Sequence, residues 1–368
     1  MTQLLDSNQN QQITGVNAQL IDVLQDIASN IEIKSNFCIS HPDYQPLELP
    51  DETVARFQNL SNVMQQKYLS LQLQNFLYGI YYNGSLRSQL ALDNQTKNLP
   101  IDLDNNSILG IDVDFYEQLH ESNCGDGYFD AGWLILREET DGSLAVKKGS
   151  LTLHIEREKH LQDCQRNAVV GDNVAIRMPK NLIQNGFYLA VSNTESQSHQ
   201  SMVRVYFNFT PGGAVAVMRR LTQMLNAIRI YFHFKVLYNP AEYKRHDSGV
   251  LYIDKSNYEA VRKVLETVYS ENKSHFKLDI PLFTKQLAPG LGLAEEPDSK
   301  FAQQESFGMN RCQIVANGLL QAWLEGDNSP EARMKAIRGQ FSHLGIDLEH
   351  PYLNANSDDI YSLLDVEQ

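Results

Sequence analysis

Apolar residues recur at helical spacing through the first third of the chain. In VNAQLIDVLQDIASNI, which begins at Val16, they follow one another every three or four positions, and the same spacing runs from Val54 to Ile80. The glycine of YYNGSL ends the pattern. We therefore predict a helical region over residues 16–130. Residues 1–15 are polar and rich in Gln and Asn, and we expect them to be disordered.

Near residue 131 the pattern changes to short runs that are typical of strands. GWLILREETDGSLAVKKGSLTLHIE, NVAIRM, GFYLAV and VRVYFNF are each bounded by turn residues. Thr210 and Pro211 then mark a helix start, and IYFHFKVL follows as another strand. We predict an α+β fold, in which the N-terminal helical region packs on a mostly antiparallel sheet with flanking helices. Residues 131–350 would form the α+β region, in one continuous globular unit with the helical region.

The composition is that of a soluble globular protein. The 368 residues are 42% hydrophobic and 21% charged, and no run of apolar residues is long enough to span a bilayer. The N-terminus lacks the basic and apolar regions of a secretory signal. The four cysteines form no C-x-x-C pair, and we expect reduced thiols in a cytoplasmic protein.

Charge is distributed unevenly along the chain. The formal net charge of −14 argues against a nucleic-acid or membrane partner. Residues 1–130 hold 5 Lys and Arg against 17 Asp and Glu, whereas residues 201–262 hold 9 against 4. This asymmetry indicates a local anion site within an acidic protein, and the alternative is a solvated basic face. The oligomeric state stays open.

Several kinds of site are disfavoured by spacing. The ten histidines include no H-x-x-x-H pair, so we expect no metal. PGLGLAEEP lacks the third glycine of a dinucleotide fingerprint and the lysine of a P-loop, so we expect no cofactor. The chain has no G-x-S-x-G, which disfavours a serine hydrolase.

Basic and aromatic side chains alternate with apolar ones on the predicted strands. Because side chains alternate across a sheet, Arg204 and Tyr206 share one face of their strand, and His233 and Lys235 share one face of theirs. Such a face suits an anion, since Arg offers a planar fork to phosphate and Lys a point charge. The alternative is a sheet with one side in water.

A longer stretch resembles a known family. VRVYFNFTPGGAVAVMRRLTQMLNAIRIYFHFKVLYNPAEYKRHDSGVLYI is similar to the HopA-type effector family, as are GDNVAIRMPKN, LAPGLGLAEEPDS and ESFGMNRC. The resemblance covers roughly residues 80–325. Some members accompany kinase-like proteins in gene clusters for lanthipeptides, which are dehydrated and thioether-bridged. The resemblance implies that members eliminate phosphate from phosphoserine or phosphothreonine, with a phosphorylated peptide as substrate and a kinase-like protein as possible partner.

A more distant resemblance to the phosphothreonine lyases implies roles for particular residues. In their order along the chain, His154 would be the general acid and Lys180 the base, followed by Arg204 and Tyr206 and then Arg311. Arg204, Tyr206, Arg245 and Arg311 would bind the phosphate. Lys235 would either add to this phosphate-binding group or, in the alternative assignment, be the base with His233 as the acid. The motifs differ locally, because Leu153 and Thr152 stand where the lyases have an aromatic residue and a lysine.

A second class of function stays open at this point. A non-catalytic effector or adaptor could bind a phosphorylated or acidic peptide, or a partner protein, on the same basic face. In that case the histidine and the lysine would lie too far apart to act on one substrate residue. A third, weaker possibility is an enzyme for another phosphorylated molecule.

Overall fold

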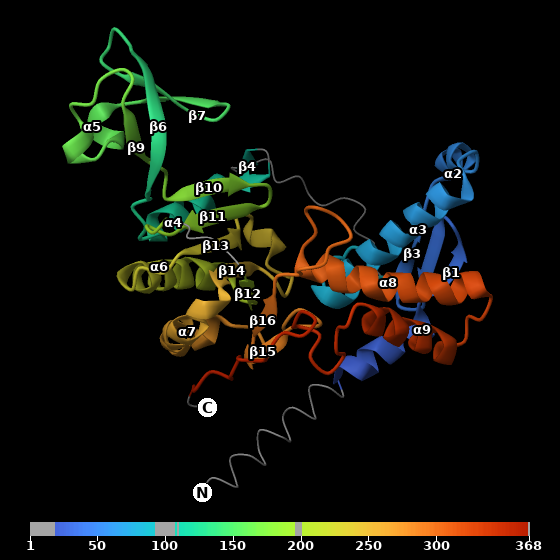
Figure 1. Cartoon of the computed structure of the whole chain (residues 1–368). Coiled ribbons are helices and arrows are strands. Elements are labelled where there is room, and N and C mark those ends of the chain that lie inside the picture. The colour runs from blue at the N-terminus through green and yellow to red at the C-terminus, as the bar shows by residue number, and fades with distance from the viewer. Residues whose placement is uncertain (1–18, 93–106, 109, 196–200, 367–368) are drawn as a thin grey trace, which may run out of the picture.

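A seven-stranded antiparallel sheet occupies the centre of the fold (Figure 1). The computed structural model describes residues 19–92, 107–108, 110–195 and 201–366, so the prediction of disorder for residues 1–15 lies outside the described residues. The strand order is β10-β11-β13-β14-β12-β16-β15. The strands are β10 (Asn181–Gln184), β11 (Phe187–Val191), β12 (Met202–Phe207), β13 (Phe232–Leu237), β14 (Gly249–Asp254), β15 (Lys285–Ala288) and β16 (Leu291–Glu295).

Two helices cover the apolar face of this sheet. α6 (Pro211–Ala227) and α7 (Tyr258–Asn272) pack beside one another, and their buried residues join those of the strands in one core. The side chain of Thr210 accepts a hydrogen bond from the backbone of Gly213, as an N-cap does, and Pro211 opens the helix. The opposite face of the sheet carries the polar side chains, so its chemistry is available to a site.

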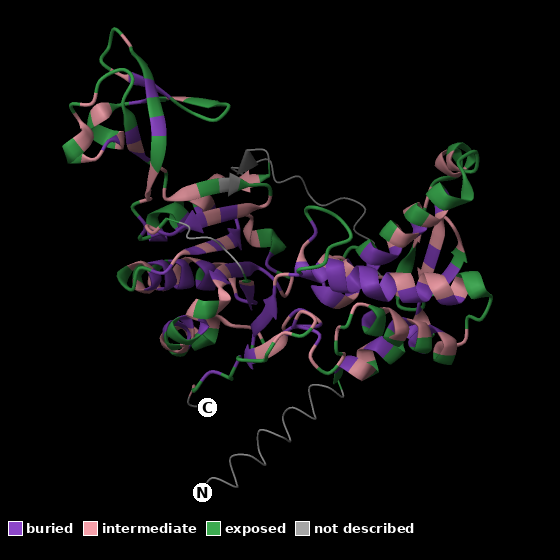
Figure 2. Cartoon of the chain, viewed as in Figure 1, coloured by how far each residue is buried: buried purple, intermediate pink, exposed green. Residues whose placement is uncertain are grey.

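The N-terminal region and the C-terminal helices form a second part of the molecule. A helix at residues 19–30 precedes a three-stranded sheet of β1 (Glu32–Ser35), β2 (Cys38–His41) and β3 (Tyr44–Glu48). α2 (Asp51–Phe57), α3 (Asn62–Leu77) and the π-helical turn η1 (Tyr78–Tyr82) follow. α8 (Phe307–Glu325) is buried along most of its length (Figure 2), because α3 and α9 (Pro330–His343) both pack against it.

A four-stranded sheet projects from the seven-stranded one as a lobe (Figure 1). Its order is β8-β7-β6-β9, with β6 (Phe129–Glu138), β7 (Leu144–Lys148), β8 (Leu151–Ile155) and β9 (Asn173–Arg177), and the short helix α5 (Arg157–His160) lies beside it. The lobe has a small core of its own around Trp133, and most of its other residues are exposed or half-buried (Figure 2). A short hairpin of β4 (Ser107–Ile108) and β5 (Ile111–Asp112) leads into α4 (Val113–Ser122).

The architecture confirms the predicted α+β class, with antiparallel sheets and flanking helices. Within residues 16–130, where the sequence pattern predicted a helical region, the structure adds strands β1 to β3 and the hairpin of β4 and β5. These five strands have between two and five residues each, which is too short for a clear alternating pattern.

Candidate functional site

The polar face of the seven-stranded sheet is built from rows of side chains that run across the strands. Arg204 on β12 lies opposite Tyr252 on β14, which in turn lies opposite His233 on β13. The next row contains Tyr206 and Lys235, with Val250 between them. The alternation predicted from the sequence therefore brings these four candidate residues onto one face.

Cations and aromatic rings alternate on this face, where Lys235 and Arg245 are half-buried and Arg204 is 8% exposed. Nζ of Lys235 lies 4.5 Å from the ring centre of Phe187 and 5.4 Å from that of Tyr252. Cζ of Arg204 lies 5.0 Å from the same Tyr252 ring, and Cζ of Arg245 lies 5.9 Å from the Phe187 ring. Each arginine thus shares an aromatic ring with Lys235, at distances where cation–π attraction operates.

Both arginines are held from one side by a carboxylate. Nε of Arg204 donates to Glu296, in the loop between β16 and α8, and its two Nη atoms make no hydrogen bond with a described residue. Arg245 donates to Asp247 through Nε at 2.5 Å and through Nη2 at 2.8 Å, while its Nη1 makes no hydrogen bond within the described part of the chain. These Nη nitrogens therefore keep hydrogen-bonding capacity, on a side chain that is 19% exposed in Arg245 and 10% exposed in Arg204.

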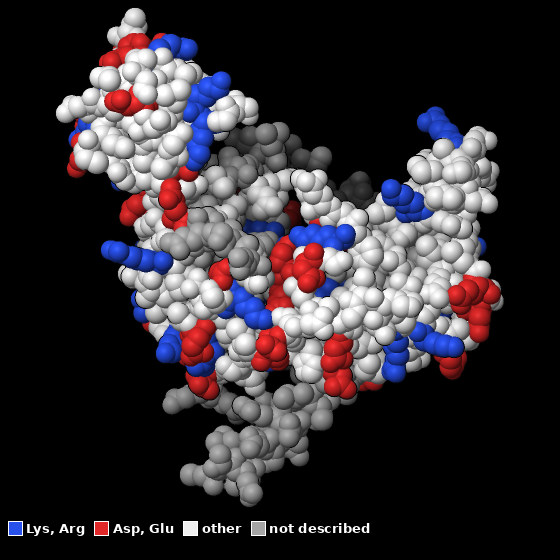
Figure 3. Space-filling view, in the orientation of Figure 1, with Lys and Arg blue, Asp and Glu red and all other residues white. Residues whose placement is uncertain are grey.

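The carboxylates stay ionised in these pairs. Burial would raise the pKa of Asp247, but the Arg245 guanidinium outweighs burial and holds that pKa below its ordinary value. The pKa of Glu296 is likewise lowered, because Arg204 and Lys300 together outweigh the effect of burial. Figure 3 shows acidic and basic side chains side by side in a recess near the middle of the molecule. The two carboxylates therefore fix the orientation of the arginines, and they also reduce the net positive charge of the face.

A cleft of about 390 Å³ lies at one end of this face, between the seven-stranded sheet and the lobe. His233 and Tyr231 line one side of the cleft, and the Tyr231 hydroxyl lies 3.0 Å from Nε2 of His233. The lobe contributes Tyr128, Asp130 and Lys148. The cleft therefore places His233 opposite polar and charged side chains of the lobe.

His154 and Lys180 do not come together. His154 is exposed on β8, and its Nδ1 lies 3.6 Å from Glu139. Lys180 follows β9 at the opposite end of the four-stranded sheet, and the register of β6 separates these two ends by about 25 Å at 3.3 Å per residue. The first acid–base assignment requires both groups to contact one substrate residue, and this arrangement does not provide that.

Lys180 instead supports the end of a helix. Its Nζ donates to the carbonyl oxygens of His120 and Asn123, both at 2.9 Å, at the C-terminus of α4. A helix leaves its last carbonyls without intrahelical partners, and a cation there also opposes the helix dipole. The contacts of Lys180 are therefore those of a structural residue.

Arg311 and Tyr206 lie beneath the surface. Arg311 is 1% exposed and donates to the backbone carbonyls of Pro351 and Leu353 and to the side chain of Asn310. Burial lowers the pKa of Arg311 to about 10. Tyr206 is 3% exposed and packs edge-on against Tyr82. Both side chains are buried more deeply than Arg204, which is 8% exposed, and than Arg245, which is half-buried.

The sequence did not reveal the aromatic rings beside Lys235 or the burial of Asp247. Phe187 and Tyr252 flank Lys235, and the only signal for them was their alternation with apolar residues in GFYLAV and VLYID. Asp247, which pairs with Arg245, is 4% exposed and therefore not a surface residue. No local pattern distinguishes a buried aspartate from an exposed one.

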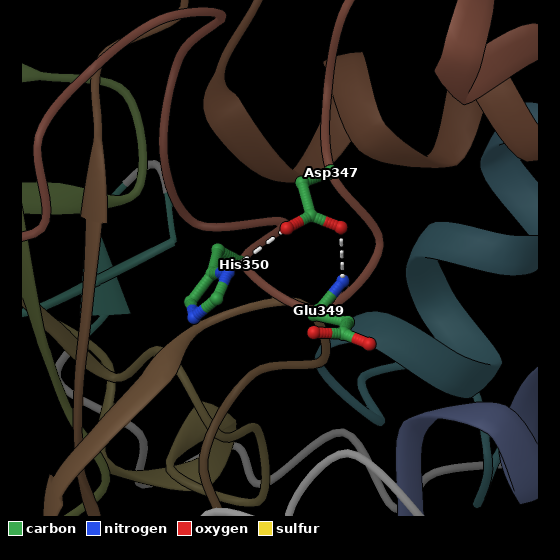
Figure 4. Close-up of side chains that lie close together, drawn as sticks. All are labelled: Asp347, Glu349 and His350. Carbon is green, nitrogen blue, oxygen red and sulfur yellow. Dashed lines mark hydrogen bonds and ion pairs between the residues drawn. The ribbon is translucent and has the colours of Figure 1, made fainter.

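Three side chains near the C-terminus have atoms close enough to share a cation. Asp347, Glu349 and His350 lie on one exposed loop (Figure 4). Asp347 already accepts hydrogen bonds from the backbone of Glu349 at 2.9 Å and from Nδ1 of His350 at 3.0 Å. These bonds account for the cluster without an ion.

None of the helices in the described residues has the length and apolar character needed to cross a membrane.

Comparisons with known proteins give a family and a set of similar structures. Two solved structures of effector proteins, from Pseudomonas syringae pv. tomato strain DC3000 and from Pseudomonas syringae pv. syringae strain 61, are each 17% identical to the chain. Each covers 83% of this chain, the alignments span 95% and 94% of theirs, and the TM-scores are 0.43 and 0.42. No curated protein matches the chain.

The family match coincides with the seven-stranded sheet. Residues 178–353 match the model of the HopA1 effector protein family. This segment begins just after β9, and it contains all seven strands of the large sheet and helices α6 to α9. The lobe and the N-terminal helices lie outside it. Over residues 178–353, slightly less than half of its length, the chain is therefore similar to the HopA1 effector protein family.

Proposed function

We propose that the chain is a phosphopeptide lyase that eliminates phosphate from phosphoserine or phosphothreonine at the polar face of the seven-stranded sheet. The observation that carries this proposal is the position of His233 and Lys235, two residues apart on one face of β13 and in the same rows as Arg204 and Tyr206. In this assignment Lys235 is the base, His233 is the acid, and Arg204 and Arg245 bind the phosphate.

The spacing on β13 suits two groups that act on one residue. Alternate residues of a strand lie about 7 Å apart, so both side chains can contact a single phosphorylated residue that lies above them. An acid and a base must both reach their substrate atoms at hydrogen-bond distance. His233 lines the cleft, which would leave the peptide backbone in the cleft and the phosphate over Lys235.

The arginines can hold phosphate without leaving their carboxylates. Arg204 has both Nη atoms available, and Arg245 has Nη1. Charge-assisted hydrogen bonds from arginine to phosphate are strong and directional. A guanidinium that is already fixed on its Nε side loses less conformational freedom when it binds. Both arginines would therefore bind a phosphate at low entropic cost.

The proposed step balances without a metal or an organic cofactor. The unprotonated amine of Lys235 takes the Cα proton, and the electron pair of that bond forms the Cα–Cβ double bond. The Cβ–O bond breaks and its electron pair leaves with the phosphate oxygen. The imidazolium of His233 gives a proton to that oxygen, so the products are a dehydroamino acid and hydrogen phosphate. The arginines stabilise the charge that develops on the leaving group.

One observation favours a second function, the binding of a phosphorylated peptide without elimination. Arg204 and Arg245 are each paired with a carboxylate, so the net positive charge of the face is smaller than its sequence suggested. A surface of this kind would recognise a phosphopeptide and release it unchanged. The two functions share their binding residues and differ in the fate of the peptide.

Mass spectrometry separates the two. A phosphothreonine peptide and its phosphoserine counterpart are incubated with the purified protein, and their masses are followed over time. Loss of one phosphoric acid from the peptide supports the lyase. Loss of HPO₃ would indicate a phosphatase and contradict it. Saturable binding with no change of mass would support the binding function in its place.

A further inference from the structure

The N-terminal region contacts the candidate site through one buried carboxylate. Oδ2 of Asp247 accepts hydrogen bonds from the Tyr78 hydroxyl at 3.3 Å and from Nδ2 of Asn83 at 3.4 Å. The same oxygen accepts from Nη2 of Arg245 at 2.8 Å. Asn83 is 0% exposed and Asp247 is 4% exposed, so these groups have no alternative partner in bulk water.

A local departure from α-helical geometry brings Asn83 to this position. α3 passes into the π-helical turn η1, in which the backbone N–H of Asn83 donates to the carbonyl of Tyr78, five residues before it. Gly84 then ends the helix at a φ of +74°, where a glycine is favoured. π-turns of this kind occur often at functional sites. The turn leaves the Asn83 side chain directed at Asp247.

Every polar group of Asn83 is used in this arrangement. Its backbone carbonyl accepts from the backbone of His246 at 2.9 Å, and its side-chain oxygen accepts from the backbone of Ser85 at 3.0 Å. The asparagine therefore connects η1 to the segment that carries Arg245 and Asp247. Its side chain has one orientation that satisfies all of these bonds.

The consequence reaches the phosphate-binding face. Asp247 binds Arg245 through both carboxylate oxygens, so the orientation of the carboxylate sets the plane of the guanidinium. Arg245 lies over the ring of Phe187, on which Lys235 also lies. A rotation of Asp247 would therefore move the guanidinium of Arg245 relative to the Phe187 ring that it shares with Lys235.

We infer that Tyr78 and Asn83 are positioning residues, which fix Arg245 for phosphate through the carboxylate of Asp247. This inference rests on the proposed function, because it takes Arg245 as a phosphate ligand. It adds residues from outside the segment that matches the family, residues 178–353, so the site would be incomplete without the N-terminal region.

Isothermal titration of the full chain with a phosphothreonine peptide tests the inference, because it yields both a dissociation constant and the fraction of competent protein. Tyr78→Phe and Asn83→Ala should each raise the dissociation constant about twofold to twelvefold, the range for one hydrogen bond worth about 0.5–1.5 kcal/mol. The stoichiometry should stay near that of the wild type. A merely structural role would lower the stoichiometry and leave the dissociation constant unchanged.

Two further variants complete the design. Asn75→Ala removes an exposed asparagine from the same helix and should leave the dissociation constant unchanged. Arg245→Ala should weaken binding by more than either positioning variant. If Arg245→Ala weakens binding and Tyr78→Phe and Asn83→Ala do not, the inference is overturned and Arg245 remains a phosphate ligand. If Arg245→Ala binds like the wild type, the proposed role of Arg245 as a phosphate ligand fails, and the inference fails with it.

Discussion

Arg245 and Asp247, two residues apart in the chain, form a bidentate ion pair in which the carboxylate is buried and the guanidinium reaches the open face. Removal of one partner of a buried ion pair leaves the other without compensation, and such losses cost about 3–5 kcal/mol. Because the Arg245 side chain keeps 19% of its surface exposed, we expect a smaller cost here, about 2 kcal/mol for Asp247→Asn at neutral pH.

The pH dependence of this cost follows from the lowered pKa of Asp247. A folded-state pKa below the unfolded value contributes stability that is present above about pH 4 and is lost as the pH falls through the folded pKa. Urea unfolding of the wild type and Asp247→Asn should therefore differ most near pH 7 and converge below about pH 4. Asp51→Asn, which changes an exposed aspartate, should show little difference throughout. If the difference in the free energy of unfolding between the wild type and Asp247→Asn grew toward low pH, it would contradict a lowered pKa for Asp247.

Lys180 should contribute to stability through the end of α4. Lys180→Ala removes two hydrogen bonds from a cation to helix-terminal carbonyls, and we expect the free energy of unfolding to fall by about 1–3 kcal/mol. Lys147→Ala is a suitable control, since Lys147 is exposed on β7. Chemical denaturation with circular dichroism measures both. Equal stabilities for the two variants would show that the carbonyl contacts contribute nothing.

Substitution of the two candidate acids, His233 and His154, should have clearly different effects on kcat. His233→Ala should lower kcat by about 10²-fold or more, which is the usual contribution of a general acid. His154→Ala should leave kcat unchanged, because this exposed residue lies at the far side of the lobe from the cleft. Phosphate release from a phosphothreonine peptide measures both rates. A large loss in His154→Ala alone would restore the first acid assignment.

Two glycines in the C-terminal helices should respond to alanine in opposite ways. A Cβ at Gly318 on α8 would lie 2.6 Å from Cα of Ile337 in the backbone of α9, so Gly318→Ala should destabilise the chain by about 1–3 kcal/mol. A Cβ at Gly339 on α9 would meet no atom within 4 Å, and Gly339→Ala should stabilise it by up to about 1 kcal/mol. Thermal unfolding of both variants checks this contrast, and a stable Gly318→Ala would argue against the close helix packing.

The parts of the fold and of the candidate site that could be predicted from the sequence are those that depend on patterns of neighbouring residues. The strand period of two placed Arg204 with Tyr206, and His233 with Lys235, and the register confirms both faces. The helix start at Thr210 and Pro211 was predictable because capping depends on neighbouring residues. These features follow from a few consecutive residues.

The remaining features depend on contacts between distant segments. The partners of Lys180 lie some 60 positions earlier, and the carbonyls that bind Arg311 lie 40 and 42 positions later. His154 follows the order of residues in the phosphothreonine lyases, but order along the chain does not determine which sheet a strand joins. In this chain β8 joins the lobe, and the large sheet begins after it.

The rate of phosphate elimination in Lys235→Ala, compared with Lys180→Ala under identical conditions, tests the central claim most directly. Mass spectrometry of a phosphothreonine peptide measures the wild-type rate as the reference. Lys235→Ala should abolish the loss of phosphoric acid, and Lys180→Ala should retain it in proportion to its folded fraction. Full activity in Lys235→Ala, with none in a folded Lys180→Ala, would contradict the account and move the reaction away from the face of β13.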